Sequence, residues 1–187
     1  MYRLPSQMGV SMPKITVSGH PGSGTSSLVK KLMEHYKWDS VNGGQIFRNE
    51  AKARNMSLAA FGKLCNEDES VDRELDEKLK QFISDDEIQI IESRLAGWWA
   101  YKLGSNSVRL WLDVSDEERA NRVVKREGIS FEQALSENTE RAEVDSQRYM
   151  SMYGLNPEQK EPYTHVVDAT HIGLDEVFSL TLEILEG

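Results

Sequence analysis

Cysteine is almost absent from this chain of 187 residues, in which Cys65 stands alone. A disulfide within the chain is therefore excluded, and we expect a protein of the reducing cytoplasm. Long apolar runs are missing too: no stretch reaches the roughly 18 residues of a membrane-spanning helix, so we expect no membrane association. The apolar share of 39% and the charged share of 28% are ordinary for a globular protein.

Basic residues are also few. Lysine and arginine together number 22, against 31 aspartate and glutamate residues, which gives a formal net charge of −9. Such a chain is a poor partner for the phosphate backbone of nucleic acids, so we expect no nucleic-acid binding. A small anionic ligand is still compatible with this charge, because a local cluster of arginines can oppose it.

The chain contains no internal repeat, low-complexity tract or linker rich in proline and glycine. We therefore predict one domain over residues 14–187, preceded by a flexible N-terminal tail over residues 1–13. Within the domain, short apolar runs alternate with helical patterns. The predicted strands are 14–18, 38–42, 87–93, 107–114 and 164–170. The predicted helices lie near 25–36, 44–54, 57–65, 70–84, 94–103, 115–127, 130–152 and 173–185.

This alternation predicts an α/β fold, in which a doubly wound parallel sheet of five strands is flanked by helices. Two helical stretches, about 43–84 and about 126–155, are longer than a simple crossover between strands requires. We interpret the first as a substrate-binding insert and the second as a mobile lid that closes over the ligand.

The stretch Gly19–Ser27 reads GHPGSGTSS and lies between the first predicted strand and the first predicted helix. Small residues in that context let backbone N–H groups surround a phosphate at a helix N-terminus. The predicted ATP-binding residues are Gly19, His20, Pro21, Gly22, Ser23, Gly24, Thr25, Ser26 and Ser27. Ser26 occupies the position whose hydroxyl binds Mg²⁺ in such loops. The side chain of His20 is expected to point to solvent.

Lysine is missing from this loop, because Thr25 stands where the motif G-x-x-x-x-G-K-[ST] requires it. A threonine donates a neutral hydrogen bond, which is weaker than the charge-assisted bond of an ammonium group. Two interpretations are open at this point. Either arginines and Mg²⁺ carry the charge of phosphoryl transfer instead, or the loop binds a nucleotide without chemistry.

Arginines do occur where such a loop would need them. Arg48 and Arg94 each follow a predicted strand, at the edge of the sheet where ligands bind. Two further groups share helical faces by their spacing: Arg119, Arg122 and Arg126, and Arg141, Asp145 and Arg148. Salt bridges in solvent are the alternative interpretation of both groups, whereas a lid closing over polyphosphate would use them to bind charge.

Several segments in register resemble the archaeal type of cytidylate kinase, within the nucleoside monophosphate kinases, over about residues 14–186. The segments are ITVSGHPGSGTSS, GGQIFRNEAKARNMSLAAFG, EDESVDRELD, ESRLAGW, RLWLDVSDEERANRVVKREG and ERAEVDSQRYMSMYG. The resemblance implies transfer of the γ-phosphoryl group of ATP to CMP or dCMP, with Mg²⁺ as cofactor. Some family members carry threonine at the position of Thr25, whereas Ser93 replaces an expected glycine.

The resemblance also implies roles for individual residues on the acceptor side. The positions that match nucleoside monophosphate-binding residues are Arg48, Arg94, Asp72, Asp145 and Arg148. The two arginines after the strands would hold the acceptor phosphate, and the Asp145–Arg148 pair would contact its sugar and phosphate. Asp72, or alternatively Asp76, would lie near the acceptor base.

On the donor side, Arg126 and Arg141 match lid positions that reach the donor phosphates and the group in transfer. The catalytic positions implied in this way are Arg141, Arg126, Arg148 and Thr25, with Ser26 as the Mg²⁺ ligand. We expect a monomer that binds small nucleotides.

Two alternatives remain beside this hypothesis. One is the same reaction on AMP or UMP, although no D-G-[FY]-P-R-like segment follows the third predicted strand, as it would in an ordinary adenylate kinase. The other is a non-catalytic nucleotide-binding module with a degenerate loop. A module of that kind would have no use for arginines on the acceptor side.

Overall fold

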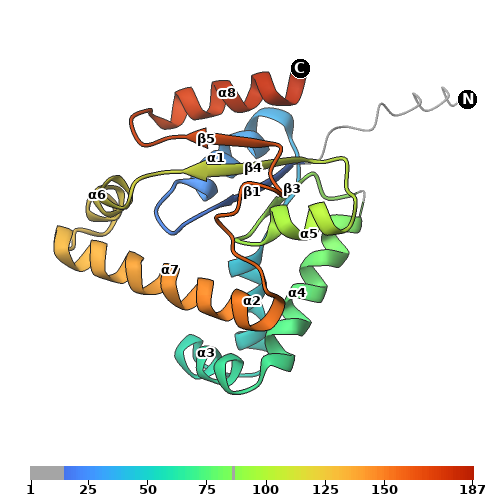
Figure 1. The fold of residues 1–187 in the computed structure, drawn as a ribbon, viewed down its shortest axis with the longest axis vertical. Helices are drawn as coiled ribbons and strands as arrows, with labels where there is room; N and C mark the ends of the chain where they lie inside the picture. Colours follow the sequence, from blue (N-terminus) through green and yellow to red (C-terminus); the bar gives the residue numbers. More distant parts are fainter. Residues whose placement is uncertain (1–14, 86) are drawn as a thin grey trace, which may run out of the picture.

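The computed structural model describes residues 15–85 and 87–187. The expected tail, and Lys14 at the start of the first predicted strand, lie outside the described residues. Five parallel strands form one sheet in the order β2-β3-β1-β4-β5 (Figure 1). The strands are β1 (Ile15–Gly19), β2 (Ser40–Asn42), β3 (Ile90–Glu92), β4 (Val108–Asp113) and β5 (His165–Asp168). The predicted fold class is confirmed, with β2 and β3 shorter than their apolar runs.

All of the predicted helices are present in the described part of the chain. They are α1 (Thr25–Tyr36), α2 (Gly43–Ala53), α3 (Leu58–Glu67), α4 (Glu69–Ser84), α5 (Ala96–Lys102), α6 (Asp116–Glu127), α7 (Phe131–Tyr153) and α8 (Leu174–Glu186). Serine side chains begin three of them, because Ser57 accepts from the Ala60 N–H, Ser115 from the Glu118 N–H and Ser130 from the Gln133 N–H. Gly128 ends α6 in the left-handed conformation, at φ 70°.

Two hydrophobic clusters cover the two faces of the sheet. Neighbouring residues of β3 point to opposite faces, so that Ile90 packs in one cluster and Ile91 in the other. The Ile90 cluster joins β1 and β4 to α1 and α8, through residues such as Leu28 and Val177. The Ile91 cluster joins the sheet to α4, α5 and α7, and contains the adjacent buried residues Trp98 and Trp99. The central strands are thereby fixed from both sides.

Two helical groups extend from the sheet on the side where the strands end (Figure 1). Helices α2, α3 and α4 enclose a small cluster of their own around Phe61 and Cys65, and α6 and α7 enclose another around Val123 and Ala134. Helices α2, α3 and α4 lie within the stretch 43–84 and α7 within 126–155, whereas almost all of α6 precedes the second stretch. No helix in the part of the chain that the structure describes is both long and apolar enough to cross a membrane.

Candidate active site

The loop between β1 and α1 has the backbone of a phosphate-binding loop. Gly22 and Gly24 adopt φ values of 85° and 92°, a region that favours glycine. At Gly22 a side chain is also excluded by space, since a Cβ atom there would lie 2.9 Å from the carbonyl oxygen of Arg119. The loop therefore needs glycine at these positions, and its last residue leads directly into the N-terminus of α1.

Three arginines outside the loop donate hydrogen bonds to its backbone carbonyl oxygens. Arg94 donates to the Gly19 oxygen at 2.8 Å, Arg119 to the Pro21 oxygen at 3.0 Å and Arg122 to the Ser23 oxygen at 3.0 Å. Ser23 Oγ donates to the His20 oxygen at 2.7 Å. Carbonyl oxygens repel an anion. Hydrogen bonds from cationic arginines offset this repulsion and so favour phosphate binding at the loop.

The arginines of α6 divide into two kinds. Arg119 is 3% exposed and Arg122 is half-buried, and both support the phosphate loop as described. The shared helical face predicted for them was interpreted as a surface that closes over the ligand, but these two side chains are structural. Arg126 differs: its side chain is 65% exposed and pairs with Glu127 at 2.6 Å.

Glu92, at the end of β3, was not singled out from the sequence. Its Oε1 atom accepts hydrogen bonds from Thr25 Oγ1 at 2.8 Å and from Ser26 Oγ at 2.6 Å. Its Oε2 atom accepts from Asn42 Nδ2 at 2.6 Å, and the residue is only 8% exposed. The available signal was an acidic residue inside the otherwise apolar run IQIIES. The threonine that replaces lysine is thus a hydrogen-bond donor to a buried carboxylate.

The phosphate loop opens onto a cavity of about 680 Å³. Of the predicted loop residues, Gly19, His20, Pro21, Gly22, Thr25 and Ser26 line it, whereas Ser23, Gly24 and Ser27 do not. The other predicted site residues all line it: Arg48, Asp72, Arg94, Arg126, Arg141, Asp145 and Arg148. The cavity also contains Glu92 and Asn138, which the sequence did not indicate. Residues from both helical groups and from the sheet edge thus face one space.

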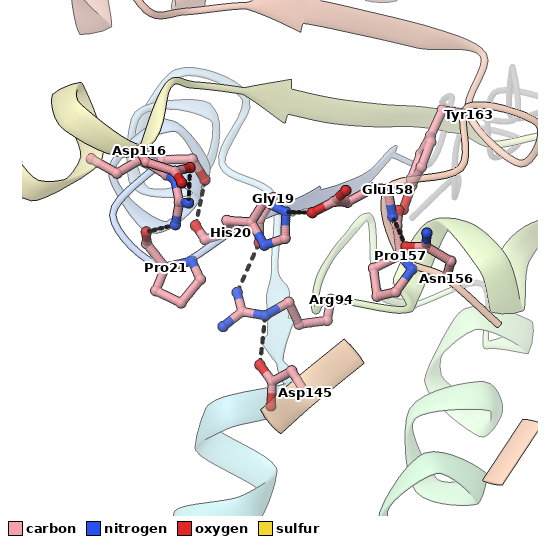
Figure 2. Close-up of polar contacts among 12 residues, drawn as sticks. Gly19, His20, Pro21, Arg94, Asp116, Asp145, Asn156, Pro157, Glu158 and Tyr163 are labelled. Atoms are coloured by element: carbon pink, nitrogen blue, oxygen red, sulfur yellow. Dashed lines mark hydrogen bonds and ion pairs between the residues drawn. The ribbon is translucent and has the colours of Figure 1, made fainter. Parts of the chain in front are cut away.

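A chain of opposite charges crosses this cavity. Arg94 donates through Nε to Asp145 Oδ2 at 2.8 Å and through Nη1 to the Gly19 oxygen, so that it joins α7 to the phosphate loop (Figure 2). Arg148 lies 3.4 Å from Asp72 and 3.6 Å from Asp145. These guanidinium groups are held in place by carboxylates, and a planar guanidinium group fixed in this way is suited to contact a phosphate.

Arg141 and Arg48 are less engaged. Among the described residues, Arg141 has neither a hydrogen-bond nor an ion-pair partner, and Arg48 bonds only the neutral side chain of Gln45. Desolvation by the cavity walls, together with the Arg94 cation, lowers the pKa of Arg141. Two guanidinium groups that line a cavity without a counter-ion favour an anionic ligand there.

Two carboxylates on α4, the buried Asp72 and the half-buried Asp76, lie at the far side of the cavity. Burial raises the pKa of Asp72 and of Asp76, because the charged form loses its hydration. Asp76 accepts a hydrogen bond from the Tyr153 hydroxyl at 2.7 Å, and Asp72 is the partner of Arg148. Carboxyl groups of this kind are typical of a site that recognises a polar ligand.

The expectation for His20 was wrong. Its side chain is only 12% exposed, and Nε2 lies 2.7 Å from Glu158 Oε1. The ring packs edge-on against Trp111, with centroids 5.2 Å apart (Figure 2 shows His20 beside Glu158). A histidine between glycine and proline gave no sign in the sequence of a partner 138 positions away.

Comparison with known proteins places this geometry in a family. The cytidylate kinase of Thermococcus kodakarensis is 39% identical over 173 residues, which cover 90% of this chain and 88% of that protein. The cytidylate kinase of Haloarcula marismortui is 37% identical, over 92% of this chain and 89% of that protein. A family model described as an AAA domain matches residues 18–141.

Solved structures support the same fold at lower identity. A gluconokinase from Sinorhizobium meliloti superposes with a TM-score of 0.60 at 17% identity, covering 94% of this chain and 92% of that one. A shikimate kinase from Bacteroides thetaiotaomicron has a TM-score of 0.60 at 14% identity, covering 94% and 99%. With the phosphate loop, the arginine-lined cavity and these sequence relationships in place, the chain belongs to the cytidylate kinase family.

Proposed function

We propose that the protein transfers the γ-phosphoryl group of ATP to CMP or dCMP, giving ADP and CDP or dCDP. The observation that carries this proposal is the single cavity that has a phosphate loop at one end and arginines from three further elements around it. The relatives whose sequences match over nine-tenths of the chain are cytidylate kinases. We further propose that the enzyme acts as a monomer in the cytoplasm.

The donor site is the stretch Gly19–Ser27. Its glycine backbone and the N-terminus of α1 bind the phosphates of ATP. Mg²⁺ fits beside them, because the Ser26 hydroxyl and the Glu92 carboxylate place two hard oxygen ligands 2.6 Å apart. Held by these two residues, the ion would supply positive charge that stabilises the phosphates. Thr25 helps to orient the Glu92 carboxylate through its 2.8 Å hydrogen bond.

The acceptor site lies on the opposite side of the cavity. Arg48 and Arg94 hold the phosphate of the nucleoside monophosphate, and Asp145 and Arg148 contact its sugar and phosphate. Asp72 lies toward the base. In this arrangement helices α2–α4, over about 43–84, form the acceptor-binding insert. The carboxylates release guanidinium donors to the ligand when it binds, so that ion pairs within the protein are exchanged for ion pairs to phosphate.

Catalysis follows from positioning and from stabilisation of charge. Arg141, Arg126 and Arg148 supply guanidinium groups to the phosphoryl group in transfer, and the lid over about 126–155 carries all three. Arg126 leaves Glu127, an exposed partner, when the lid closes. No covalent protein intermediate is required, since the acceptor phosphate attacks the γ-phosphorus directly.

A panel of acceptors tests the proposal. The protein is incubated with ATP and Mg²⁺ and with CMP, dCMP, UMP or AMP in turn, and nucleoside diphosphate is quantified by chromatography. We expect CMP or dCMP to be phosphorylated at least about tenfold more efficiently than AMP, a difference of about 1.4 kcal/mol in transition-state binding. Equal rates on CMP and AMP would contradict the pyrimidine assignment. ATP binding without transfer to any acceptor would identify a non-catalytic module.

A further inference from the structure

His20 has the longest side chain of the phosphate loop. The other residues of Gly19–Ser27 are glycine, proline, serine and threonine, whose side chains are short. The imidazole ring is buried against the Trp111 ring of β4, edge to face at 86°. Backbone at Gly22 and Gly24 is intrinsically mobile, so a loop of this composition needs an external contact to stay in one conformation.

The partner of His20 lies on a well-anchored segment. Residues 154–163 join α7 to β5, and Glu158 lies in their middle. One hydrogen bond fixes this segment to α5, since Trp98 Nε1 donates to the Asn156 oxygen at 2.9 Å. A second lies within the segment, where Tyr163 Oη donates to the Pro157 oxygen at 2.7 Å, and the Tyr163 ring packs against Trp111 of β4. A third bond, from the Glu158 N–H to Asn156 Oδ1 at 2.9 Å, tightens the turn. Glu158 is therefore a firm point of attachment (Figure 2).

The surroundings of His20 favour its neutral form. Burial, followed by the Arg119 cation, lowers the pKa of His20 below its ordinary 6.5, and Arg94 acts in the same direction. Glu158 opposes them, while Asp116 and Asp145 each pair with one of the two arginines. A neutral ring donates its Nε2–H to the Glu158 carboxylate, which is a charge-assisted hydrogen bond at 2.7 Å.

We propose that His20 is a positioning residue: its bond to Glu158 braces the first turn of the phosphate loop against the 154–163 segment and holds the loop ready for the phosphates of ATP. The inference rests on the proposed function for the identity of the donor. It assigns His20 no direct contact with the nucleotide. It also gives a role to Glu158, which lies outside the residues assigned to either substrate.

A double-mutant cycle tests the brace. Binding of ATP with Mg²⁺ is measured by titration calorimetry, without any acceptor, for the wild type, His20→Ala, Glu158→Ala and the double variant. We expect each single variant to bind ATP about tenfold more weakly, which is typical for the loss of a hydrogen bond to a charged group. The double variant should bind no more weakly than the singles, because both remove the same contact. Glu161→Ala, in the same segment, is the control and should bind like the wild type.

Two replacements of His20 distinguish the contribution of its hydrogen bond to ATP affinity from the contribution of its packing. His20→Gln keeps an N–H donor at a similar distance and should recover most of the affinity, whereas His20→Leu fills the space without a donor and should not. In steady state the variants should raise the KM for ATP and leave the KM for CMP unchanged. Glu158 has a side chain 59% exposed, so its replacement does not threaten folding.

Three outcomes would overturn the brace. They are additive losses in the double variant, wild-type affinity in Glu158→Ala, and equal affinity of His20→Gln and His20→Leu. The first of these would point to a direct contact between His20 and phosphate. A wild-type protein that is inactive on CMP would refute the proposed function. The binding test of the His20–Glu158 contact would still be interpretable, because ATP binding is measured without an acceptor.

Discussion

Ser26 and Glu92 form the shortest polar contact at the entrance to α1, with the serine Oγ 2.6 Å from the carboxylate Oε1. Thr25 donates to that same oxygen, and Asn42 holds the other. Where related loops carry a lysine that contacts phosphate, this chain has a hydroxyl that orients an acidic side chain. The acidic group then lies beside the serine, where a metal ion that binds both would sit next to the donor phosphates.

Introducing the missing lysine is expected to be harmful. In Thr25→Lys the ammonium group would pair with Glu92 and occupy the space between the carboxylate and the loop. We expect kcat to fall about tenfold or more, since the ion pair competes with the proposed metal ligand. Thr25→Ser, which keeps the hydroxyl, should retain most of the activity. A Thr25→Lys enzyme that turns over faster than the wild type would show that threonine is a defect.

Removal of the Glu92 charge should weaken the response to Mg²⁺. Glu92→Gln keeps the size of the side chain and can still accept from Thr25 and Ser26. We expect the Mg²⁺ concentration for half-maximal activity to rise about 10- to 100-fold, as it does when groups around a metal are altered. Titration of activity with Mg²⁺ at saturating ATP and CMP measures this. An unchanged Mg²⁺ requirement would exclude Glu92 as a ligand.

Arg141 should carry more of the catalysis than any other lid residue. It lines the cavity without a counter-ion in the described residues, so its charge is available to the phosphoryl group. We expect Arg141→Ala to reduce kcat by about 10³-fold or more with small changes in both KM values, as for other arginines that stabilise this transition state. Lys30→Ala, at an exposed position of α1, is the control. Turnover near that of the wild type would remove Arg141 from the mechanism.

The sequence predicted the fold well because each element has a local cause. Apolar runs mark the strands, and Ser115 and Ser130 mark helix starts that the structure confirms through their hydrogen bonds. The conformation of the phosphate loop was predictable from spacing within one segment, since Gly22 and Gly24 adopt the positive φ values that glycine favours. These features need only a few neighbouring residues to be recognised.

The parts of the site that depend on distant contacts were not predictable in the same way. Glu92 meets Thr25 across 67 positions, and His20 meets Glu158 across 138. Arg119 shares a helical face with Arg126, but only the packing of α6 against the phosphate loop separates the structural Arg119 from the exposed Arg126, which lines the cavity. Contacts of this kind follow from the order of the strands, which the sequence did not determine.

The ionised carboxylate of Asp76 is expected to lower the free energy of unfolding at neutral pH. Burial raises its pKa above the ordinary 3.8, so the folded protein binds a proton more tightly than the unfolded chain does. The carboxylate therefore opposes folding once the pH exceeds 3.8, and the cost grows until the pH passes the folded-state pKa. Asp76→Asn should raise the melting temperature at pH 7, because an amide oxygen can still accept from Tyr153.

The gain from Asp76→Asn should shrink as the pH is lowered toward 3.8, where the carboxyl group becomes neutral in both states. Melting temperatures measured by circular dichroism from pH 8 downward test this. Asp39→Asn is the control, because Asp39 is exposed and its carboxylate has no partner among the described residues. A gain that is constant with pH would mean that the pKa of Asp76 is not shifted.

Gly97 in α5 should tolerate no side chain, although alanine is the better helix former. A Cβ atom at Gly97 would lie 2.4 Å from Cε1 of Tyr163, and that ring cannot yield easily. Its hydroxyl bonds the Pro157 oxygen, and its face packs against Trp111. Gly97→Ala should therefore lower the free energy of unfolding by about 1–3 kcal/mol, which is the usual cost of overpacking.

Gly62 in α3 is the matched control for this prediction. Among the described side chains, a Cβ atom there would meet only Phe47 Cζ, at 4.0 Å, which is an ordinary contact. Gly62→Ala should raise the free energy of unfolding by up to about 1 kcal/mol, because the helix gains propensity without a clash. Urea denaturation of both variants measures the two changes. Equal effects at the two positions would show that helix propensity decides both, and that the Tyr163 ring moves aside at little cost.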